Sequence, residues 1–339
     1  MGVNLTPLVQ PTILRLDDLR GRSFAVDGNN VLYQFLALIR RPDGSHLTDQ
    51  EGRATSHLVG LLYRTTRLIS DYAMDLVFVF DGWPSERKRA ELRSRRRVRE
   101  KAKAAYAEAV AREDYATAWS KAVTSTVLTQ EMVRDAQRLL TLLGIPWIQA
   151  PGEGEAQAAF VCARGDVWAT STRDYDALLY GTPRLLRYLT IAGREFLPSH
   201  QTSRPLEPEL IQAESLFAHL GMSREQLIDL AILVGTDYHP GVHGIGPKKA
   251  LALLRDHGRL EDLAIDIREQ LAPDYDEIRD LFLHPPLTKE YALQQEPVDP
   301  EGVLSFLCDE KNFSREQVTQ VLGRLRRRVR QPSLESFEP

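Results

Sequence analysis

Short apolar runs alternate along this chain with longer segments whose apolar residues recur at helical spacing. The runs are continuous rather than alternating, which is typical of strands covered on both faces of a mostly parallel sheet. Five such runs lie at residues 23–27, 76–81, 145–149, 167–171 and 184–189. The helical segments between them lie at residues 31–40, 55–72, 129–143 and 155–163. The pattern predicts an α/β fold with a central, mostly parallel twisted sheet flanked by helices.

The later part of the chain departs from this alternation. Residues 191–205 are polar and contain two prolines, so we expect a loop there. From Glu207 the character is helical, and residues 258–330 are expected to form helices separated by prolines. The tail, residues 331–339, is too short and polar to pack alone, which predicts a flexible end.

A basic helical segment, about residues 85–128, is inserted into the α/β pattern. Arginine and lysine dominate its first half, and acidic partners for i,i+4 pairing are few. Such a charge run is usually a solvated face, but here phosphate binding explains it better. The basic residues that we expect to contact nucleic acid include Arg93 and Arg96.

Seven carboxylates follow predicted strands or open predicted helices. Each has an ordinary explanation when it is taken alone, since Asp favours turns and Glu favours a first helical turn. In open α/β sheets, however, sites lie beyond the carboxyl ends of the strands. The seven residues that could meet at that edge are Asp27, Asp81, Glu153, Glu155, Asp174, Asp176 and Asp237.

Like charges gathered at one edge repel, at roughly 4 kcal/mol for a pair about 4 Å apart at an effective dielectric of about 20. Protons or divalent cations must offset that repulsion. Ligands that are all oxygen, without His or Cys, favour Mg²⁺ or Mn²⁺ over zinc. Two such ions about 3.5–4 Å apart can activate a water and stabilise the leaving oxygen of a phosphodiester. The residues alone therefore predict a metal-dependent nuclease.

A glycine-rich turn opens a predicted helix near residue 247. Gly244 and Gly246 break the chain, and Lys248 and Lys249 fall in the first helical turn. Such a turn exposes backbone N–H groups to a phosphate, and the lysines add charge. The alternative is a packing corner that binds nothing.

The composition of the chain mainly excludes classes of site and of protein. The chain has 339 residues, 43% of them hydrophobic, which is enough for a sizeable core, and its net charge of −4 indicates no partner. Its two cysteines form no CxxC pattern, so a zinc site or a disulfide framework is not expected. The chain shows neither a membrane-spanning run nor a signal peptide. We expect an intracellular protein in a reducing compartment.

Several stretches resemble one known family, and they occur in that family's order: VDGNNVLYQFL, FVFDGWP, APGEGEAQAA, STRDYDALLYG and GTDYHPGVHGIGPKKAL. Together with the N-terminal MGV they cover the chain to about Gly258. The chain thus resembles the archaeal and eukaryotic flap endonucleases of the structure-specific 5′-nuclease superfamily. The resemblance implies cleavage at the base of 5′ flaps in DNA replication, where it matures Okazaki fragments, and in repair, with 5′–3′ exonuclease activity.

The resemblance also implies a domain plan. A single nuclease domain spans residues 1–330. Its parts are an N-terminal region at about 1–84, a helical arch at about 85–128, a region with a helix–two-turn–helix at about 129–258, and C-terminal helices at about 259–330. Localisation follows as the cytoplasm of an archaeon or the nucleus of a eukaryote, and a monomer is expected.

Roles for individual residues follow from the same resemblance. The ligands of a first Mg²⁺ ion, for which Mn²⁺ can substitute, are matched by Asp27, Asp81, Glu153 and Glu155. Asp174, Asp176 and Asp237 match ligands nearer a second ion. Lys88 and Arg95 match arch residues that act on the scissile phosphate. Tyr33 matches an aromatic that stacks on a base, and Arg40 matches a position near the DNA junction.

The matches extend to the termini and to one further ion. The segment 242–249 matches a helix–two-turn–helix that grips the duplex backbone and holds K⁺ in relatives. The amine of Gly2 is expected near the active site. Arg173 departs from the family by placing a cation beside an acidic pair. The residues matching a peptide that binds the sliding clamp are Gln331, Leu334 and Phe337, but Glu338 replaces the usual second aromatic, which predicts weaker binding.

Two other functions remain open at this point. A sister 5′–3′ exonuclease or bubble-cutting enzyme would use the same ions, although the short insertion favours a flap enzyme. A non-catalytic DNA-binding clamp adaptor would keep the fold without the activity, but all the matching carboxylates are present. Metal-dependent cleavage of branched DNA discriminates among these functions.

Overall fold

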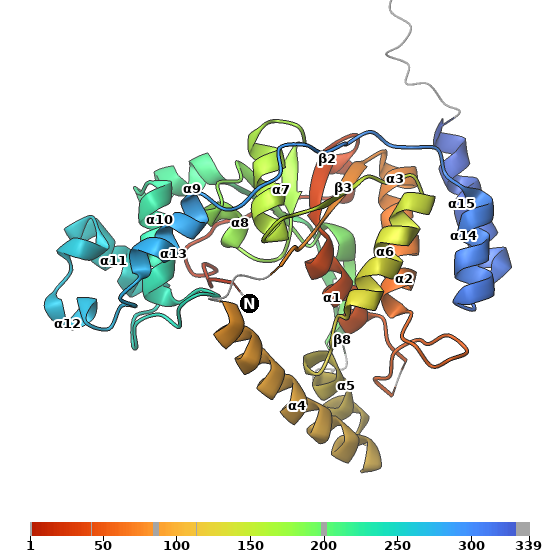
Figure 1. Cartoon of the computed structure of the whole chain (residues 1–339), viewed down its shortest axis with the longest axis horizontal. Coiled ribbons are helices and arrows are strands. Elements are labelled where there is room, and N and C mark those ends of the chain that lie inside the picture. Colours follow the sequence, from red (N-terminus) through yellow and green to blue (C-terminus); the bar gives the residue numbers. More distant parts are fainter. Residues whose placement is uncertain (1, 42, 84–87, 113, 198–201, 330–339) are drawn as a thin grey trace, which may run out of the picture.

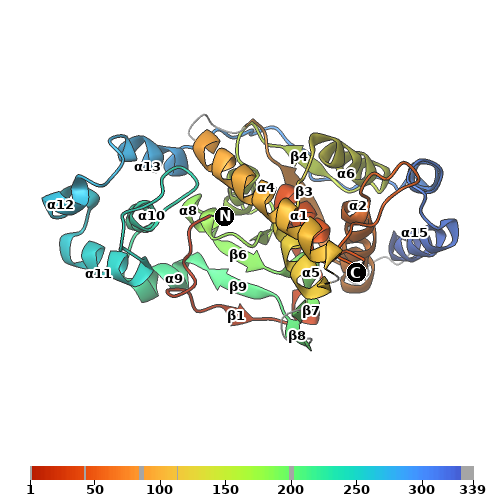
Figure 2. The same cartoon turned by 90° about the horizontal axis from the view of Figure 1, so that it is seen from below.

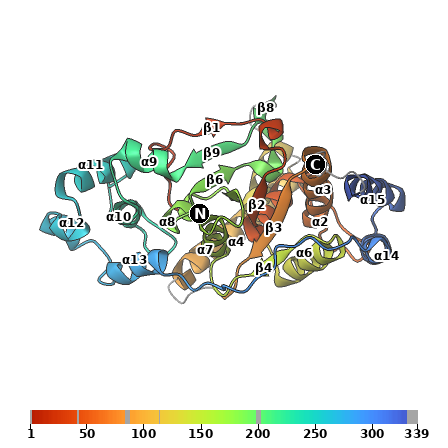
Figure 3. The same cartoon turned by 90° about the horizontal axis from the view of Figure 1, so that it is seen from above.

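A seven-stranded sheet runs through the centre of the molecule in the order β1-β9-β6-β5-β2-β3-β4 (Figures 1 and 3). This computed structural model describes residues 2–41, 43–83, 88–112, 114–197 and 202–329. The five strands from β6 to β4 are parallel, whereas β9 and β1 are added antiparallel at one side. The strands are β1 Thr12–Ile13, β2 Ser23–Asp27, β3 Asp75–Phe80, β4 Trp147–Gln149, β5 Ala169–Ser171, β6 Arg184–Arg187 and β9 Glu209–Gln212. The predicted mostly parallel sheet is confirmed.

Helices cover both faces of this sheet, and further helices lie beyond its two sides (Figure 1). Those of the first half are α1 Gly28–Leu38, α2 Ser56–Gly60, α3 Thr66–Tyr72, α4 Arg89–Ala111, α5 Tyr115–Thr124, α6 Gln130–Leu142, α7 Gly154–Ala163 and α8 Asp176–Leu179. Those of the second half are α9 Ala213–Leu220, α10 Arg224–Val234, α11 Pro247–His257, α12 Ile265–Arg268, α13 Tyr275–Leu283, α14 Pro300–Leu304 and α15 Arg315–Val329. No helix among the described residues is long and apolar enough to cross a membrane.

The period-two pattern of the strands decides which helix covers which face. Phe24 and Val26 of β2 point into a large core that is shared with α1, α2, α3, α6 and α15. Ala25 points to the opposite face, where it meets Ala158 and Val161 of α7. Small residues on both sides let α7 approach β2 closely. The N-terminus of α7, which carries two acidic residues, is thereby held over the middle of the sheet.

Most predicted boundaries are confirmed, and the shifts have local causes. The first helix begins at Gly28 rather than Val31, because Asp27 caps it by accepting a hydrogen bond from the backbone N–H of Asn30. The predicted helix 55–72 is one continuous helical stretch, but Leu61–Thr65 winds as a π-helix between α2 and α3.

Two predictions for the later chain were wrong in part. The expected loop at 191–205 contains strands β7 Gly193–Leu197 and β8 Thr202–Leu206, which pair antiparallel as a separate two-stranded sheet. A two-stranded sheet consists of edges, where proline is tolerated, so Pro205 did not exclude a strand. Helical character does not begin at Glu207 either, because β9 pairs with β6 before α9 starts.

The C-terminal region is not a continuous series of helices. Residues 284–299 form no helix and run as an extended strap past β4 and α6 (Figure 3). The fully buried Gln157 of α7 fixes the strap, since its side-chain amide donates to the carbonyl of Thr288 (2.9 Å) and accepts from the N–H of Thr288 (2.8 Å). Backbone bonds to Gly144 and Leu142 replace those that a helix would make.

A histidine is buried in the larger core. His57 of α2 is 1% exposed, and neither of its ring nitrogens has a hydrogen-bond partner. Burial, and then the positive charges of Lys311 and His46, lower the pKa of His57 to about 3. The folded protein therefore holds this imidazole neutral.

We predict that His57→Leu reduces the acid sensitivity of folding. From the ordinary pKa of 6.5 down to about 3, the unfolded chain binds a proton at His57 that the folded chain does not. Stability therefore falls as pH drops through this window, by at most about 1.4 kcal/mol per pH unit for one proton. Thermal unfolding between pH 7 and pH 4.5 should show a smaller loss in the variant.

The exposed His219 supplies the control, because His219→Leu should leave the pH slope unchanged. Parallel stability curves for wild type and His57→Leu would show that His57 is protonated in the folded protein.

Candidate active site

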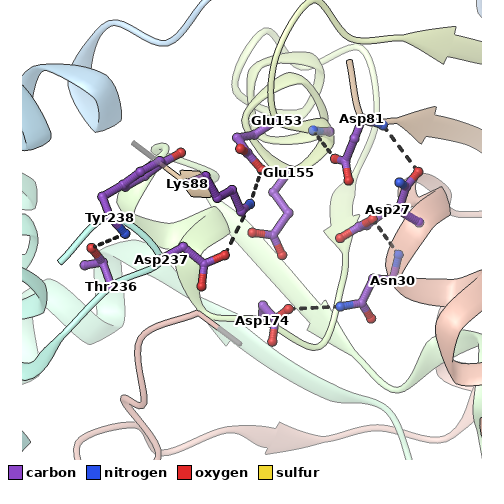
Figure 4. Close-up of polar contacts among 12 residues, drawn as sticks. Asp27, Asn30, Asp81, Lys88, Glu153, Glu155, Asp174, Thr236, Asp237 and Tyr238 are labelled. Atoms are coloured by element: carbon purple, nitrogen blue, oxygen red, sulfur yellow. Dashed lines mark hydrogen bonds and ion pairs between the residues drawn. The ribbon is translucent and has the colours of Figure 1, made fainter. Parts of the chain in front are cut away.

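The carboxyl ends of the five parallel strands bring the predicted acidic residues to one edge of the sheet. Asp27 ends β2, Asp81 follows β3, and Glu153 lies between β4 and α7. The chain after β5 adds Asp174 and Asp176. Asp237 reaches the edge from the loop after α10 and lies near Asp174 in Figure 4. Strand order reverses between β2 and β5, a point where open α/β sheets form a crevice.

Hydrogen bonds tie the two sides of this switch point together. The hydroxyl of Thr172 contacts Asp27 Oδ2 (3.0 Å) and Glu155 Oε1 (2.9 Å), and the side-chain amide of Asn30 donates to Asp174 Oδ2 (3.0 Å). A hydroxyl has one hydrogen to donate, so both Thr172 contacts are satisfied together only when one of the two carboxyls carries a proton.

Close backbone approach sets the positions of Asp81 and Asp176. The N–H of Gly154 donates to Asp81 Oδ1 (2.7 Å), and a Cβ at Gly154 would lie 2.9 Å from that oxygen. The N–H of Val3 donates to Asp176 Oδ1 (2.8 Å), and a Cβ at Gly2 would lie 2.4 Å from the same oxygen. Only glycine fits at residue 2 without displacing Asp176. The N-terminal segment thus lies at this site, as predicted.

Two basic residues of the arch bind the side of the cluster nearest α10. Lys88 Nζ donates to Glu153 Oε2 (2.5 Å) and lies 3.2 Å from Asp237 Oδ2, while Arg95 Nη2 lies 2.5 Å from Asp237 Oδ1 (Figure 4 draws the Lys88 contacts). Burial raises the pKa of Asp237, but Lys88 and Arg95 outweigh it and hold the pKa below its ordinary value. Burial lowers the pKa of Lys88, but Glu153 and Asp237 dominate and raise it.

The other side of the cluster has raised pKa values instead. Burial and the charge of Asp81 raise the pKa of Asp27 to about 8. Burial and the charge of Asp174 raise the pKa of Asp176 to about 7, and they raise the pKa of Glu155 well above its ordinary value. Charge compensation is therefore uneven. Lys88 and Arg95 neutralise the carboxylates nearest α10, whereas the buried carboxylates on the far side of the cluster repel one another.

The donor set fits hard divalent cations. All seven predicted ligands are carboxylates, and those with raised pKa values are where a cation would relieve most repulsion. The side chains as they stand line an open rim. Among the described residues, no three His, Cys, Asp or Glu side chains close around a single point as a cage for an ion. Hydrogen bonds to Thr172, Asn30 and backbone N–H groups hold the carboxylates in these positions.

The arch helix α4 hangs below this edge and crosses it when seen from below (Figures 1 and 2). Arg99 of α4 donates to the hydroxyl of Tyr33 (3.0 Å), and its guanidinium lies 5.4 Å from that ring's centroid. Tyr33 therefore faces α4 beside the carboxylates. Arg93 and Arg96 of the same helix are exposed, and Arg96 pairs with Glu100 (2.9 Å).

Arg40 holds the base of the arch to α1. Its guanidinium donates to the carbonyls of Gly44 (2.6 Å) and Ala122 (3.0 Å) and to the hydroxyl of Thr126 (2.6 Å). Burial lowers the pKa of Arg40 to about 10. The structure thus gives Arg40 a structural task, and its predicted contact with the DNA junction stays a prediction.

The predicted phosphate-reading turn lies between α10 and α11. Gly244 has a φ of 75°, and Gly246 precedes Pro247 at the first position of α11. Lys248 and Lys249 follow in the first turn of α11 and are exposed. Val242 and Ile245 pack into the core beneath, so the glycines and lysines face outward. The tail residues Gln331, Leu334 and Phe337 lie outside the described residues.

Sequence reasoning missed the residues that position the carboxylates. Thr172 is 2% exposed and contacts two acids, and Asn30 binds Asp27 through its backbone and Asp174 through its side chain. The only sequence signal was their place, since Thr172 follows the strand before Asp174, and Asn30 stands three residues after Asp27. That spacing is typical of a helix cap and does not reveal a contact across strands.

The structure combines a parallel sheet, a carboxylate rim at its switch point and a basic helix across that rim, an arrangement that is typical of nuclease-like α/β proteins. Comparison with protein families agrees: residues 1–102 match the XPG N-terminal domain and residues 144–237 match the XPG I-region. Flap endonuclease 1 of Pyrococcus horikoshii is 46% identical over 99% of this chain and 98% of its own length.

One solved structure supports the same assignment, and a more distant one shares the fold alone. Flap endonuclease-1 from Methanococcus jannaschii superposes with a TM-score of 0.76 at 39% identity, over 96% of this chain and 98% of that one. A Holliday junction-resolving enzyme, GEN1, solved with product DNA and a Mg²⁺ ion, shares the fold, with a TM-score of 0.59 at 19% identity over 95% of this chain and 76% of that one. This chain belongs to the flap endonuclease family of 5′-nucleases, and it is a hydrolase.

We predict that Lys88→Met destabilises the protein in EDTA by about 1–3 kcal/mol, because it leaves Glu153 and Asp237 short of a cation in a mostly buried setting. Lys101 lies exposed on the same helix, and Lys101→Met should change stability by less than about 0.5 kcal/mol. Denaturant unfolding measures both variants. Equal losses would mean that the ion pairs of Lys88 contribute nothing to folding.

Proposed function

We propose that this flap endonuclease cuts 5′ single-stranded flaps from branched DNA at their base, by two-metal-ion hydrolysis, during replication and repair. We infer an accompanying 5′–3′ exonuclease activity. The observation that carries the proposal is the buried, unevenly compensated carboxylate rim directly beneath a basic arch helix. Its site of action would be the cytoplasm of an archaeon or the nucleus of a eukaryote.

The carboxylates would hold two Mg²⁺ ions, and Mn²⁺ can replace them. We assign to the first ion the carboxylates of Asp27, Asp81, Glu153 and Glu155. We assign to the second ion those of Asp174, Asp176 and Asp237. When bound, the ions supply an activated water and charge stabilisation at the leaving oxygen. The raised pKa values of Asp27 and Asp176 support this assignment, because a bound cation favours the ionised carboxylates.

The chain's own residues orient the reacting strand. Lys88 and Arg95 lie against the carboxylates and can donate to the scissile phosphate in exchange for Glu153 and Asp237. Tyr33 presents its ring beside Asp174 and Arg99, where a base of the reacting strand can stack.

The turn between α10 and α11 would grip the duplex backbone. Exposed N–H groups around Gly244 and Gly246 and the charges of Lys248 and Lys249 suit phosphate contacts that carry no sequence information. The carbonyl groups of the same two-turn segment are suitable ligands for a K⁺ ion. Recognition would then depend on backbone shape rather than on base identity.

The C-terminal tail would bind a sliding clamp of the PCNA type. Gln331, Leu334 and Phe337 supply a polar anchor and two apolar anchors, while Glu338 stands where a second aromatic is expected. One missing apolar anchor predicts weaker binding than a peptide with both aromatics provides.

The decisive experiment is cleavage of an end-labelled double-flap DNA with Mg²⁺ and with EDTA, beside a blunt duplex and a bubble. We expect a single cut at the base of the 5′ flap, only with Mg²⁺, because the rim needs cations to bring in a phosphodiester. Cutting mainly at duplex ends or bubbles would instead assign a sister activity. Tight flap binding without any cutting would point to a non-catalytic adaptor.

Asp174→Asn is the matched variant for this experiment. It removes one negative charge but keeps a group that can hydrogen-bond to Asn30. Cleavage should fall by at least about a hundredfold, with flap binding in Ca²⁺ or EDTA nearly unchanged. Wild-type turnover would remove Asp174 from the metal site.

A separate prediction concerns the turn before α11. The double change Lys248→Ala and Lys249→Ala should weaken binding to all DNA sequences alike and should reduce the slope of log affinity against log salt by about 1–2. Fluorescence anisotropy at several salt concentrations measures both quantities. Single-turnover cleavage at saturating protein should stay near the wild-type rate, and an unchanged salt slope would contradict phosphate binding by these lysines.

A further inference from the structure

A cavity of about 550 Å³ opens beside Asp174, between α1, the arch and the N-terminal segment. A second cavity, of about 230 Å³, lies on the side of Asp81 and Lys88. Tyr33 and Arg99 line both cavities, so the carboxylate rim lies between two hollows that meet beneath α4. When a phosphate of a DNA strand reaches the rim, the neighbouring nucleotides of that DNA strand therefore lie in these two cavities.

The larger cavity is lined by more positive than negative side chains. Arg99, Arg173 and Arg187 line it together with Asp174. Glu209 neutralises Arg187 at 2.9 Å, whereas Arg99 donates to the hydroxyl of Tyr33. Within the described part of the chain, Arg173 makes no ion pair with a carboxylate, and its side chain is exposed at the cavity. A guanidinium in this setting suits the oxygens of a phosphate.

Arg173 is held in place by an aromatic platform. Its guanidinium lies 5.6 Å from the ring centroid of Tyr188, and its carbonyl accepts from Arg187 Nε (3.0 Å). Arg187 also donates to the hydroxyl of Tyr188 (2.8 Å), which fixes the ring. Tyr188 has a φ of 63°, a left-handed conformation that is rare for an aromatic residue and that recurs at ligand sites. The contacts reduce the entropy that Arg173 would lose on binding a phosphate.

We propose that Arg173 is a positioning residue that binds a backbone phosphate of the reacting strand next to the scissile one, inside the larger cavity. The proposal rests on the proposed cleavage of DNA flaps. Arg173 directly precedes Asp174, whereas Lys88 and Arg95 bind the opposite side of the rim. The DNA strand is thus held at the scissile phosphate by Lys88 and Arg95 and at a neighbouring phosphate by Arg173, and Tyr33 lines the cavities on both sides of the rim.

The test combines Arg173→Gln with flap DNAs that carry one neutral methylphosphonate, placed in turn at each of the phosphates flanking the scissile bond. Single-turnover cleavage by wild type should slow on the order of tenfold when the contacted phosphate is neutral. Arg173→Gln should be slowed to the same extent on unmodified DNA and should show no further loss with that one substitution. The position that shows this non-additivity tells whether the phosphate belongs to the unpaired flap or to the paired strand.

Two variants serve as controls. Arg22→Gln removes the same charge from an arginine that also stacks on an aromatic, since Arg22 lies 5.3 Å from the ring centroid of Trp168, at the opposite edge of the sheet. It should cleave every substrate at the wild-type rate. Arg173→Lys keeps the charge and should recover most of the rate lost in Arg173→Gln.

Several outcomes would overturn the proposal. Wild-type cleavage by Arg173→Gln is one of them, and an effect that adds to that of the methylphosphonate at every position is another. A changed Mg²⁺ requirement without coupling to any phosphate would show that Arg173 acts on the metal site alone. Wild-type protein that cuts no flap at all would refute the proposed function instead.

Discussion

The repulsion among carboxylates gathered at one edge of the sheet is the constraint on which the rest of the site depends. Neutral groups hold several of these acids, among them Thr172, Asn30 and the N–H of Gly154. Such donors orient a charge but do not remove it. Burial and the repulsion that remains raise the pKa values of Asp27 and Asp176, because both effects disfavour the ionised carboxylate. Folding therefore creates a site that binds cations favourably, because a cation relieves this repulsion.

The arch takes part in this balance. Lys88 and Arg95 neutralise Glu153 and Asp237, so electrostatic attraction helps to bring the first turns of α4 to the rim. Asp237 lies in the loop that leads to the glycine-rich turn before α11, and one carboxylate thereby links the arch with that turn. Divalent cations and a substrate phosphate would compete for the same partners. Arch position and active-site charge are therefore coupled by direct contacts.

The two phosphate contacts that we propose around the rim differ in kind. Around Gly246, backbone N–H groups and exposed lysines suit a duplex backbone that is read by shape. At the larger cavity, Arg173 is fixed by Tyr188 and Arg187 and suits one defined phosphate. The first kind would tolerate sliding along the DNA, while the second would set which phosphodiester stands over the carboxylates. Affinity and cleavage position are thus assigned to different parts of the molecule.

Local patterns in the chain were enough to predict the parallel sheet, the acidic residues at its carboxyl edge and the basic insertion, because apolar runs and helical periodicity can be recognised without knowing any distant contact. It did not reveal β7, β8 and β9, whose short or proline-containing segments become strands only through pairing partners. Three further contacts became visible in the folded chain alone: Thr172 joins Asp27 to Glu155, Arg40 holds the base of the arch, and Tyr188 supports Arg173. These contacts join residues on different elements, and their energy depends on distance and burial, which no local pattern encodes.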